Sequence, residues 1–381
     1  MRSLRRNTAT IAVAAGALVF TACGTGSTGA SSGEALNDAE LASHQKVVDQ
    51  ATAPVTEWNG PTSAPAPVKD KEIAVIECAA VVSGCVRQAE GIKQAGELLG
   101  WSVSVYDGKG DPVEWNRAAT QAINSGVDAI ILAAADPVPM KSALDLAAEK
   151  GIPVGTTGVG IAAGGGVAFD VGADYGYWGE ALGSWIVADS RGSAKVLQTV
   201  DKEFASQGDI QTEMNRVIDS CAGCEVVATE QFVVTDIGNG LGQRIANTLQ
   251  RNPDITYVNG AFDSAAADMI PAMKAIGLGD RVKVVASVGA TQNLGFVASG
   301  DMQKVDVVQD DLYLGFAAVD QLNRLLAGQP LWKTPGETNE KLLYAQGAPS
   351  KLLTEENVGD PEKPWVAEND YVAHYMKIWG V

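Results

Sequence analysis

The stretch Ala129–Val154, AIILAAADPVPMKSALDLAAEKGIPV, decides the fold of this chain. Residues Ile130–Leu132 form a short apolar run of the kind that is buried on both faces of a parallel sheet. Asp136-Pro137 ends that strand, because proline lacks an N–H group and disfavours helix at the residue before it. Apolar residues in Met140–Ala147 then recur at helical spacing, Gly151 supplies the helix stop, and a second apolar strand follows. The stretch predicts a strand–helix–strand unit of an open α/β sheet, in which the loop after the first strand faces any ligand.

The same alternation of strands and helices recurs along the rest of the chain. Further strands are expected at 73–77, 101–106, 167–172, 195–200, 225–234, 256–259, 283–287 and 306–309, and further helices at 86–99, 116–125, 175–189, 210–219, 240–251, 264–276 and 314–326. A chain of 381 residues is too long for one simple core. The fold class is therefore α/β, with two Rossmann-like lobes of three layers each.

The N-terminus carries the marks of export. Arg2, Arg5 and Arg6 precede an apolar segment over 11–20, which is too short to span a bilayer, so residues 1–22 are expected to be a secretory signal peptide. Cys23 directly follows small residues, as in the bacterial lipobox, and would become a lipid-modified first residue on the outer face of the cell membrane. The alternative is an ordinary signal peptide with a coincidental cysteine. Residues 23–70, rich in Gly, Ser and Pro, are expected to form the anchor and a flexible linker.

Charge and histidine content exclude several classes of function. The formal net charge is −18, which disfavours nucleic acid and anionic membrane surfaces as partners. The two histidines, His44 and His374, lie near opposite ends of the chain, so a histidine-centred catalytic or zinc site is not expected. No nucleophile–base set is evident either. We therefore expect neither enzymatic activity nor a bound metal or cofactor.

Four cysteines remain besides Cys23, and they form two local pairs, Cys78 with Cys85 and Cys221 with Cys224. An even number of cysteines in an oxidising compartment favours two disulfides. A zinc site is disfavoured because six residues separate the first pair and no histidine accompanies either pair. Free thiols remain the alternative.

Several segments together resemble the type I periplasmic solute-binding proteins of the ribose- or sugar-binding class. They are KEIAVIEC (71–78), INSGVDAIILAAADP (123–137), AAEKGIPV (147–154), GADYGYWGEALG (172–183), NGAFDSAAADMIPAMKAIG (259–277), VDVVQDDLYLGFAAVDQLNRLLAG (305–328) and LLTEENV (352–358). The resemblance covers the chain from Lys71 to its C-terminus, and it lies in the order and spacing of these segments.

The resemblance implies two lobes that close on a ligand by a hinge motion. The first lobe would comprise 71–173 and 310–336, the second 174–309 and 337–381, with crossings near 172–174, 309–311 and 334–341. It also implies a monomer that captures a sugar or polyol and delivers it to the permease of an ABC importer. A sensor that presents the solute to a membrane receptor kinase would have the same fold and remains an alternative.

The resemblance also implies where the ligand would bind. Asp263, Gln309 and Asp136 match ligand-contacting positions of the sugar-binding members. Asp263 and Gln309 are expected to hold the polar end of the ligand, against a more apolar wall from the first lobe. The competing interpretation of Asp263 is a cap of the helix that begins at Ser264.

Other positions depart from the sugar-binding pattern. The family's Asp-Arg pair falls on Gly158-Val159, its second-lobe arginine falls near Gln211, and the aspartate of its Gly-Phe-Asp-Gly turn falls on Val288. Because hydrogen bonds to charged groups are strong, a ligand that is held differently or is less hydroxylated is an alternative. Residues that could substitute are Trp178, Tyr175, Trp115, Glu203 and Glu77.

Overall fold

A computed structural model describes residues 36–161, 164–334 and 348–381. The first sheet is wholly parallel, with strand order β2-β1-β3-β4-β5. Its strands are β1 (Glu72–Glu77), β2 (Ser102–Asp107), β3 (Ala129–Ala133), β4 (Val154–Thr157) and β5 (Phe169–Val171). All five residues of β3 are buried, as its unbroken apolar run predicts, whereas β2 is an edge strand with four of its six residues exposed.

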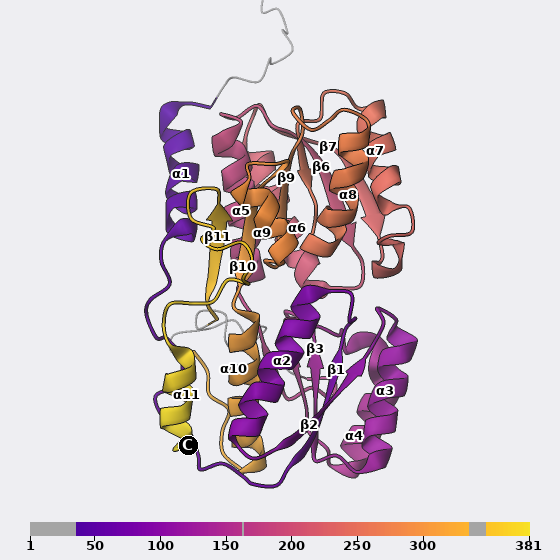
Figure 1. The fold of residues 1–381 in the computed structure, drawn as a ribbon, viewed down its shortest axis with the longest axis vertical. Helices are drawn as coiled ribbons and strands as arrows, with labels where there is room; N and C mark the ends of the chain where they lie inside the picture. Colours follow the sequence, from indigo (N-terminus) through magenta and orange to yellow (C-terminus); the bar gives the residue numbers. More distant parts are fainter. Residues whose placement is uncertain (1–35, 162–163, 335–347) are drawn as a thin grey trace, which may run out of the picture. The chain divides into compact units, whose positions relative to one another are not determined.

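Helices cover both faces of this sheet (Figure 1). They are α2 (Ser83–Leu98) and α10 (Asp311–Leu326) on one face, and α3 (Pro112–Ser125) and α4 (Lys141–Lys150) on the other. Glycines let α2 and α10 approach closely, since a Cβ atom at Gly315 would lie 2.2 Å from the backbone of Gly91. Gly126 and Gly151 end α3 and α4 in the left-handed conformation that glycine adopts without strain.

The second sheet has strand order β11-β10-β9-β8-β6-β7, and only β11 is antiparallel to its neighbour among the described strands. Its strands are β6 (Lys195–Asp201), β7 (Glu225–Phe232), β8 (Tyr257–Asn259), β9 (Lys283–Ser287), β10 (Gln303–Gln309) and β11 (Ser350–Thr354). Its helices are α5 (Tyr175–Asp189), α6 (Ala205–Ser220), α7 (Leu241–Arg251), α8 (Asp263–Ala275) and α9 (Thr291–Ala298). Two three-layer α/β lobes are thus present, and the predicted fold class is confirmed.

The chain passes between the lobes where short connections follow β5 and β10. Residues 172–174 lead from β5 of the first sheet to α5, which packs on the second lobe against α6. Gln309 ends β10 of the second sheet, and Asp311 begins α10, which packs on the first lobe against α2. Residues 335–347 lie outside the described part, so most of the third expected crossing is not described.

The segment ahead of β1 is folded over 38–70, in contrast to the flexible linker that its composition predicts. Helix α1 (Asp38–Thr52) begins with a capping box between Asn37 and Glu40 and packs on α5 and β11. Residues 53–70 then follow α10, where Val68 N donates to Asn323 Oδ1 (2.9 Å). The linker expectation was wrong because the composition of a polar, Pro-rich segment does not indicate that it packs on helices and strands distant in the chain. Residues 23–35 lie outside the described part.

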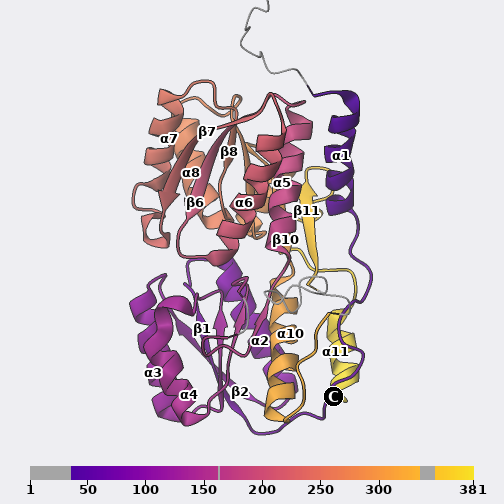
Figure 2. The same cartoon turned by 180° about the vertical axis from the view of Figure 1, so that it is seen from behind.

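The C-terminal segment divides between the lobes. β11 joins the second sheet, as expected for 337–381, but α11 (Tyr371–Trp379) packs against α10 of the first lobe through stacked rings of Phe316 and Trp379. Figures 1 and 2 both show α1 and α11 along one edge of the molecule.

The two terminal segments also bond to each other. Glu368 N donates to Val55 O (3.0 Å), and Asn357 Nδ2 donates to Thr52 O (3.3 Å). Trp58 stacks on His374, with ring centroids 4.7 Å apart. We call residues 38–70 and 355–379 together the terminal clasp.

Candidate functional site

A small pocket lies between the carboxyl ends of the two sheets. Its wall is formed by Val82, Gly84, Cys85, Gln88, Ala134, Gly158, Tyr175, Phe204, Ser206, Gln207, Phe262, Val288, Gln309 and Asp311. Both lobes contribute to it, and so do Gln309 and Asp311 at one crossing and Tyr175 directly after the other. The position is the one predicted for an open parallel sheet, where ligands bind beyond the carboxyl ends of the strands.

The pocket volume is about 50 Å³. Benzene occupies an engineered protein cavity of roughly 150 Å³, so a sugar ring needs the lobes to separate or side chains to move before it can enter. The wall residues come from two lobes joined by short connections, which is the arrangement that permits such a movement.

A network of buried polar side chains forms one side of the pocket. Asp311 Oδ1 accepts hydrogen bonds from Gln309 Nε2 (2.9 Å) and Gln88 Nε2 (3.2 Å). Gln309 Oε1 in turn accepts from the Tyr175 hydroxyl (3.2 Å), and Gln88 Oε1 accepts from the Thr157 hydroxyl (2.8 Å). The network therefore joins α2, α10, the end of β10 and the start of α5, and it fixes the orientation of each amide.

Arg87 neutralises the carboxylate of this network and reaches the second lobe. Its guanidinium donates to Asp311 Oδ2 (2.5 Å) and to the carbonyl oxygen of Val288 (2.7 Å), which follows β9. Burial raises the pKa of the Asp311 carboxyl, while Arg87, Gln309 and Gln88 act in the opposite direction. One arginine thus pairs the buried charge and links α2 to a pocket loop of the other lobe.

Apolar side chains from the second lobe face this network. Phe204 and Phe262 meet edge to face with ring centroids 5.6 Å apart, and both line the pocket. Val82, Phe204 and Phe262 are the N-cap residues of α2, α6 and α8, and none provides a side-chain cap. Ser, Thr, Asn or Asp normally occupies this position, so three apolar N-caps at one pocket are unusual.

The backbone is strained at two positions in the pocket wall. Val288 has φ 108°, which is a rare conformation for a β-branched residue, and Ala134 has φ 54°. Such strain concentrates at ligand-binding sites, where the surrounding structure holds it in place. At Val288, the backbone N–H donates to Val307 O (2.9 Å) and the carbonyl accepts from Arg87.

Of the expected ligand contacts, the structure brings Gln309 to the pocket but not Asp263. Asp263 is buried inside the second lobe, where its carboxylate accepts hydrogen bonds from Ala290 N (2.5 Å) and Gln303 Nε2 (3.3 Å). It is also not the cap of α8, because it is the first residue of that helix and its side chain bonds the loop after β9. Asp263 holds that loop in place without lining the pocket.

Asp136, Trp178 and Gln211 do not line the pocket either. Asp136 accepts a hydrogen bond from Val138 N (2.8 Å) at the turn after β3. Trp178 is buried in the core, where its ring meets Tyr175 edge to face. Gln211 lies one helical turn beyond Gln207, which does line the pocket. The sequence analysis expected that helix to begin at 210, so it did not include the first turn, which carries Ser206 and Gln207.

Of the possible substitutes, only Tyr175 lines the pocket. Trp115 donates its indole N–H to Cys78 O (2.9 Å) inside the first lobe. Glu203 accepts from Val234 N (2.6 Å), and Glu77 lies at the end of β1, where burial raises the pKa of its carboxyl. The residues that the sequence interpretation missed include Gln88, Ser206, Gln207, Phe204 and Phe262.

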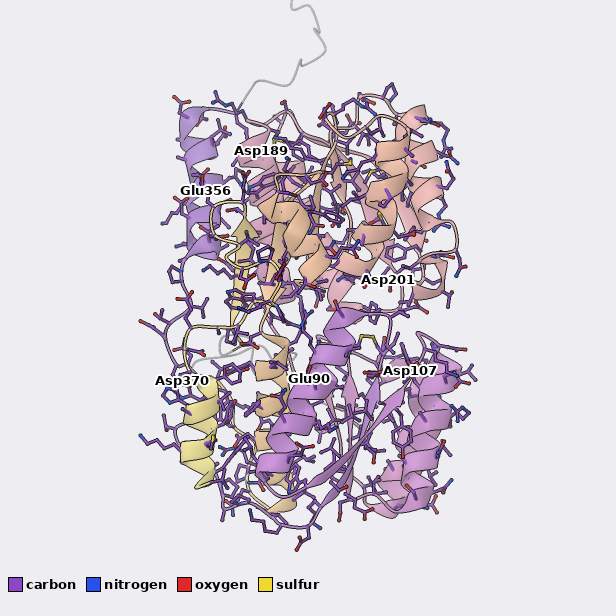
Figure 3. The ribbon with its side chains drawn as sticks, in the orientation of Figure 1. Glu90, Asp107, Asp189, Asp201, Glu356 and Asp370 are labelled. Atoms are coloured by element: carbon purple, nitrogen blue, oxygen red, sulfur yellow. A yellow bond between two sulfur atoms is a disulfide. The ribbon has the colours of Figure 1, made fainter. Side chains whose placement is uncertain are left out.

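Acidic groups from both lobes meet where the lobes face each other. Burial raises the pKa of Asp201 to about 7, and that of Glu203 is raised by burial and by the nearby charges of Asp111 and Asp236. Asp111 belongs to the first lobe and Glu203 to the second. Figure 3 shows Asp201 and Asp107 at the edges where the lobes face each other. Among the described residues, no group of three or more His, Cys, Asp or Glu is arranged to hold a metal ion.

Both expected disulfides are confirmed. Cys78–Cys85 and Cys221–Cys224 are bonded, with Cα atoms 5.7 and 5.2 Å apart. The first closes the loop between β1 and α2, which carries Val82 and Gly84 of the pocket wall. The second lies at the end of α6, away from the pocket wall.

Removing the Cys78–Cys85 disulfide with Cys78→Ala and Cys85→Ala should speed amide hydrogen exchange over 79–88. The bond closes a short loop, so the loss of stability should lie near or below the low end of about 2–4 kcal/mol. Cys221→Ala with Cys224→Ala is the matched control and should leave exchange over 79–88 unchanged. Equal exchange over 79–88 in both variants would show that the first disulfide does not hold the pocket loop.

Comparisons with known proteins agree with this geometry. No curated protein matches the chain. A solved ABC sugar transporter subunit from Rhodobacter sphaeroides 2.4.1 has a TM-score of 0.65 at 18% identity, over 75% of this chain and 99% of its own. An ABC transporter solute binding protein from Agrobacterium vitis, with bound allitol, has a TM-score of 0.65 at 18% identity, over 77% and 98%. The 5-methylthioribose transporter solute binding protein from Thermotoga lettingae has a TM-score of 0.65 at 19% identity, over 84% and 95%.

A family model described as a periplasmic binding protein domain matches residues 83–330, which is more than half of the chain. Those residues include most of both sheets, the pocket wall except Val82, and both described crossings. No described helix combines the length and apolar character needed to cross a bilayer. The chain belongs to the periplasmic binding proteins of type I, whose members are solute-binding proteins.

Proposed function

We propose that this protein captures a small sugar or polyol between its lobes and delivers it to the permease of an ABC importer. The observation that carries the proposal is the pocket itself, whose polar and aromatic wall comes from both lobes. A ligand that contacts both lobes stabilises the closed state by its differential affinity for that state. Solved relatives with the same fold are described with bound allitol, arabinofuranose and 5-methylthioribose, which supports a ligand of this size.

The proposal predicts that a sugar or polyol raises the melting temperature of the protein. A ligand that binds only the folded state adds about 2.7 kcal/mol of stability at a hundredfold excess over its Kd. A thermal-shift series with allitol, L-arabinose, D-galactose, D-fucose and 5-methylthioribose should contain at least one such ligand. Gln309→Ala should abolish that shift, whereas Gln211→Ala, one turn outside the pocket wall, should retain it. A series without any shift would contradict the proposal.

The lipid anchor is proposed to be Cys23, which lies outside the described residues. The proposal rests on the arginine-rich start, the apolar segment and the small residues before the cysteine. We expect Cys23→Ala to move the protein from the membrane fraction of the native host into the soluble extract or the medium. Unchanged retention in the membrane fraction would show that another feature holds the protein there.

A further inference from the structure

The charge of the pocket is already balanced without a ligand. Among the described residues that form its wall, Asp311 is the one carboxylate, and Arg87 pairs with it. The Asp311 side chain is fully buried, and the Arg87 side chain is 14% exposed. A ligand that carries a net charge would enter this enclosed space without a free counter-charge, which is strongly unfavourable.

The polar side chains on the Asp311 side of the pocket keep both donor and acceptor sites for a ligand. The side-chain oxygens of Gln88 and Gln309 each accept one hydrogen bond, from Thr157 and Tyr175, and each keeps a second lone-pair site. Each amide nitrogen donates one of its two N–H groups to Asp311, so one N–H on each glutamine remains. Asp311 itself accepts three hydrogen bonds and keeps about one of its four lone-pair sites.

Two helix starts add backbone donors to the same pocket. Gly84 and Ser206 are the second residues of α2 and α6, and both line the pocket. Their N–H groups have no hydrogen-bond partner within the described part of the chain, because Val82 and Phe204 supply no cap. The first N–H groups of a helix need an acceptor from outside the helix. A ligand oxygen can provide one.

The second lobe supplies a hydrocarbon part of the pocket wall. Phe204, Phe262 and Val288 face the pocket from the second lobe, and the two phenylalanine rings pack edge to face. A hydroxyl group placed against these side chains would lose its hydrogen bonds to water without replacement. The polar wall residues on that lobe are Tyr175, Ser206, Gln207 and Gln309.

Building on the proposed function, we propose that the ligand is an uncharged, single-ring solute with oxygens at one end and hydrocarbon at the other. The oxygens at the polar end face Gln88 and Gln309, and a methyl or deoxy carbon faces Phe204 and Phe262. Deoxy sugars and methyl-substituted sugars belong to this class, whereas sugar acids and amino sugars do not. The expectation placed the apolar wall on the first lobe, whereas Phe204, Phe262 and Val288 of the second lobe also contribute to it.

Matched probes test the inference. The first set consists of D-galactose, its 6-deoxy form D-fucose, and its charged analogues D-galacturonate and D-galactosamine. The second set is L-mannose and its 6-deoxy form L-rhamnose. Calorimetry should show each 6-deoxy sugar that binds to be roughly tenfold tighter than its hydroxylated parent, because the hydroxyl has no partner on the apolar wall. The two charged analogues should show no binding.

The outcomes separate the inference from the proposed function. Binding of a charged analogue, or of a hydroxylated parent as tightly as its deoxy partner, overturns the inference and leaves solute capture standing. If no probe binds but allitol or L-arabinose does, the ligand class is again wrong while the proposed function stands. If none of these sugars or polyols binds, both fail.

A pair of variants tests the charge balance without any ligand. Arg87→Met leaves Asp311 unpaired, so the melting temperature should fall more at pH 8 than at pH 5, where protonation can neutralise the carboxyl. Arg87→Met with Asp311→Asn removes both charges and should recover most of that loss at pH 8. Should the single variant fail to fold, recovery in the double variant still supports the inference. Equal losses for both variants at both pH values would overturn it.

Discussion

Gly315→Ala is expected to unfold the first lobe or to destabilise it by more than a typical core substitution. A Cβ atom at this position would lie 2.2 Å from the backbone of α2 at Gly91 and Ile92, a distance that no side-chain rearrangement can relieve. Overpacking typically costs about 1–3 kcal/mol, and a clash between two backbones lies at or above the upper end of that range. Forcing α10 away from α2 also separates Asp311 from Gln88 and Arg87, so the pocket network should be lost as well.

Gly208→Ala is the matched control for this prediction. Gly208 lies in α6, and a Cβ atom there would meet no atom of the other described residues within 4 Å. The substitution should stabilise the protein by about 0.5–1 kcal/mol, because alanine favours helix more than glycine does. Urea unfolding monitored by circular dichroism measures both variants. A Gly315→Ala protein as stable as the wild type would mean that the two helices can separate without cost.

The second large effect is expected from pH, with greater stability at pH 5 than at pH 8. Burial raises the pKa of Asp201 to about 7 and the pKa of Asp310 to about 6, from 3.8. A carboxyl whose pKa is higher in the folded state contributes stability that is fully present below about pH 4. That contribution is lost as the pH rises through 6 to 7. For Asp201 alone, the loss between pH 5 and pH 8 is roughly 2.6 kcal/mol.

Asp201→Asn identifies the group responsible. Asparagine keeps an oxygen that can accept from Glu203 N and Phe204 N, as Asp201 Oδ1 does at 2.6 and 3.2 Å, but it does not titrate. The free energy of unfolding of this variant should depend less on pH than that of the wild type. Asp254→Asn, on an exposed residue, removes the same charge and should keep the wild-type dependence. An identical pH dependence in all three proteins would rule out Asp201 as the cause.

Most of the fold could be predicted because its signals are local. The apolar run of β3, the proline after it and the glycine that ends α4 each act within a few residues, and the structure follows them. Helix α5 was expected at 175–189 and occupies those residues. The repeated strand–helix order then leaves few ways to assemble the sheets.

The pocket could be predicted only in part, because its helices begin without the usual signals. Val82 and Phe204 precede α2 and α6 where a capping residue would normally mark the start. The expected helices therefore began at 86 and 210, three and five residues too late. Those missed turns carry Gly84, Ser206 and Gln207 of the pocket wall. The apolar caps that conceal the helix starts are the same side chains that face the pocket.

Asp263 shows the limit of carrying a residue over from a resemblance. Its position after β8 matches a ligand-contacting position, yet its carboxylate turns inward to Ala290 N and Gln303. Sequence position gives the strand end at which a side chain sits, but its direction depends on partners distant in the chain. Gln309, whose partners Tyr175 and Asp311 flank the crossings, does face the pocket.

The terminal clasp changes which motions the two lobes can make. The matched domain begins at residue 83 and ends at residue 330, so both halves of the clasp lie outside it. Two lobes that are joined by several connections along one edge can bend about that edge, but neither lobe can rotate freely about any single connection. Each half of the clasp is tied to both lobes: α1 packs on the second lobe and β11, which leads into 355–379, belongs to it, whereas Val68 and α11 contact α10 of the first. The clasp thus adds two connections between the lobes, which a twist of one lobe against the other would strain.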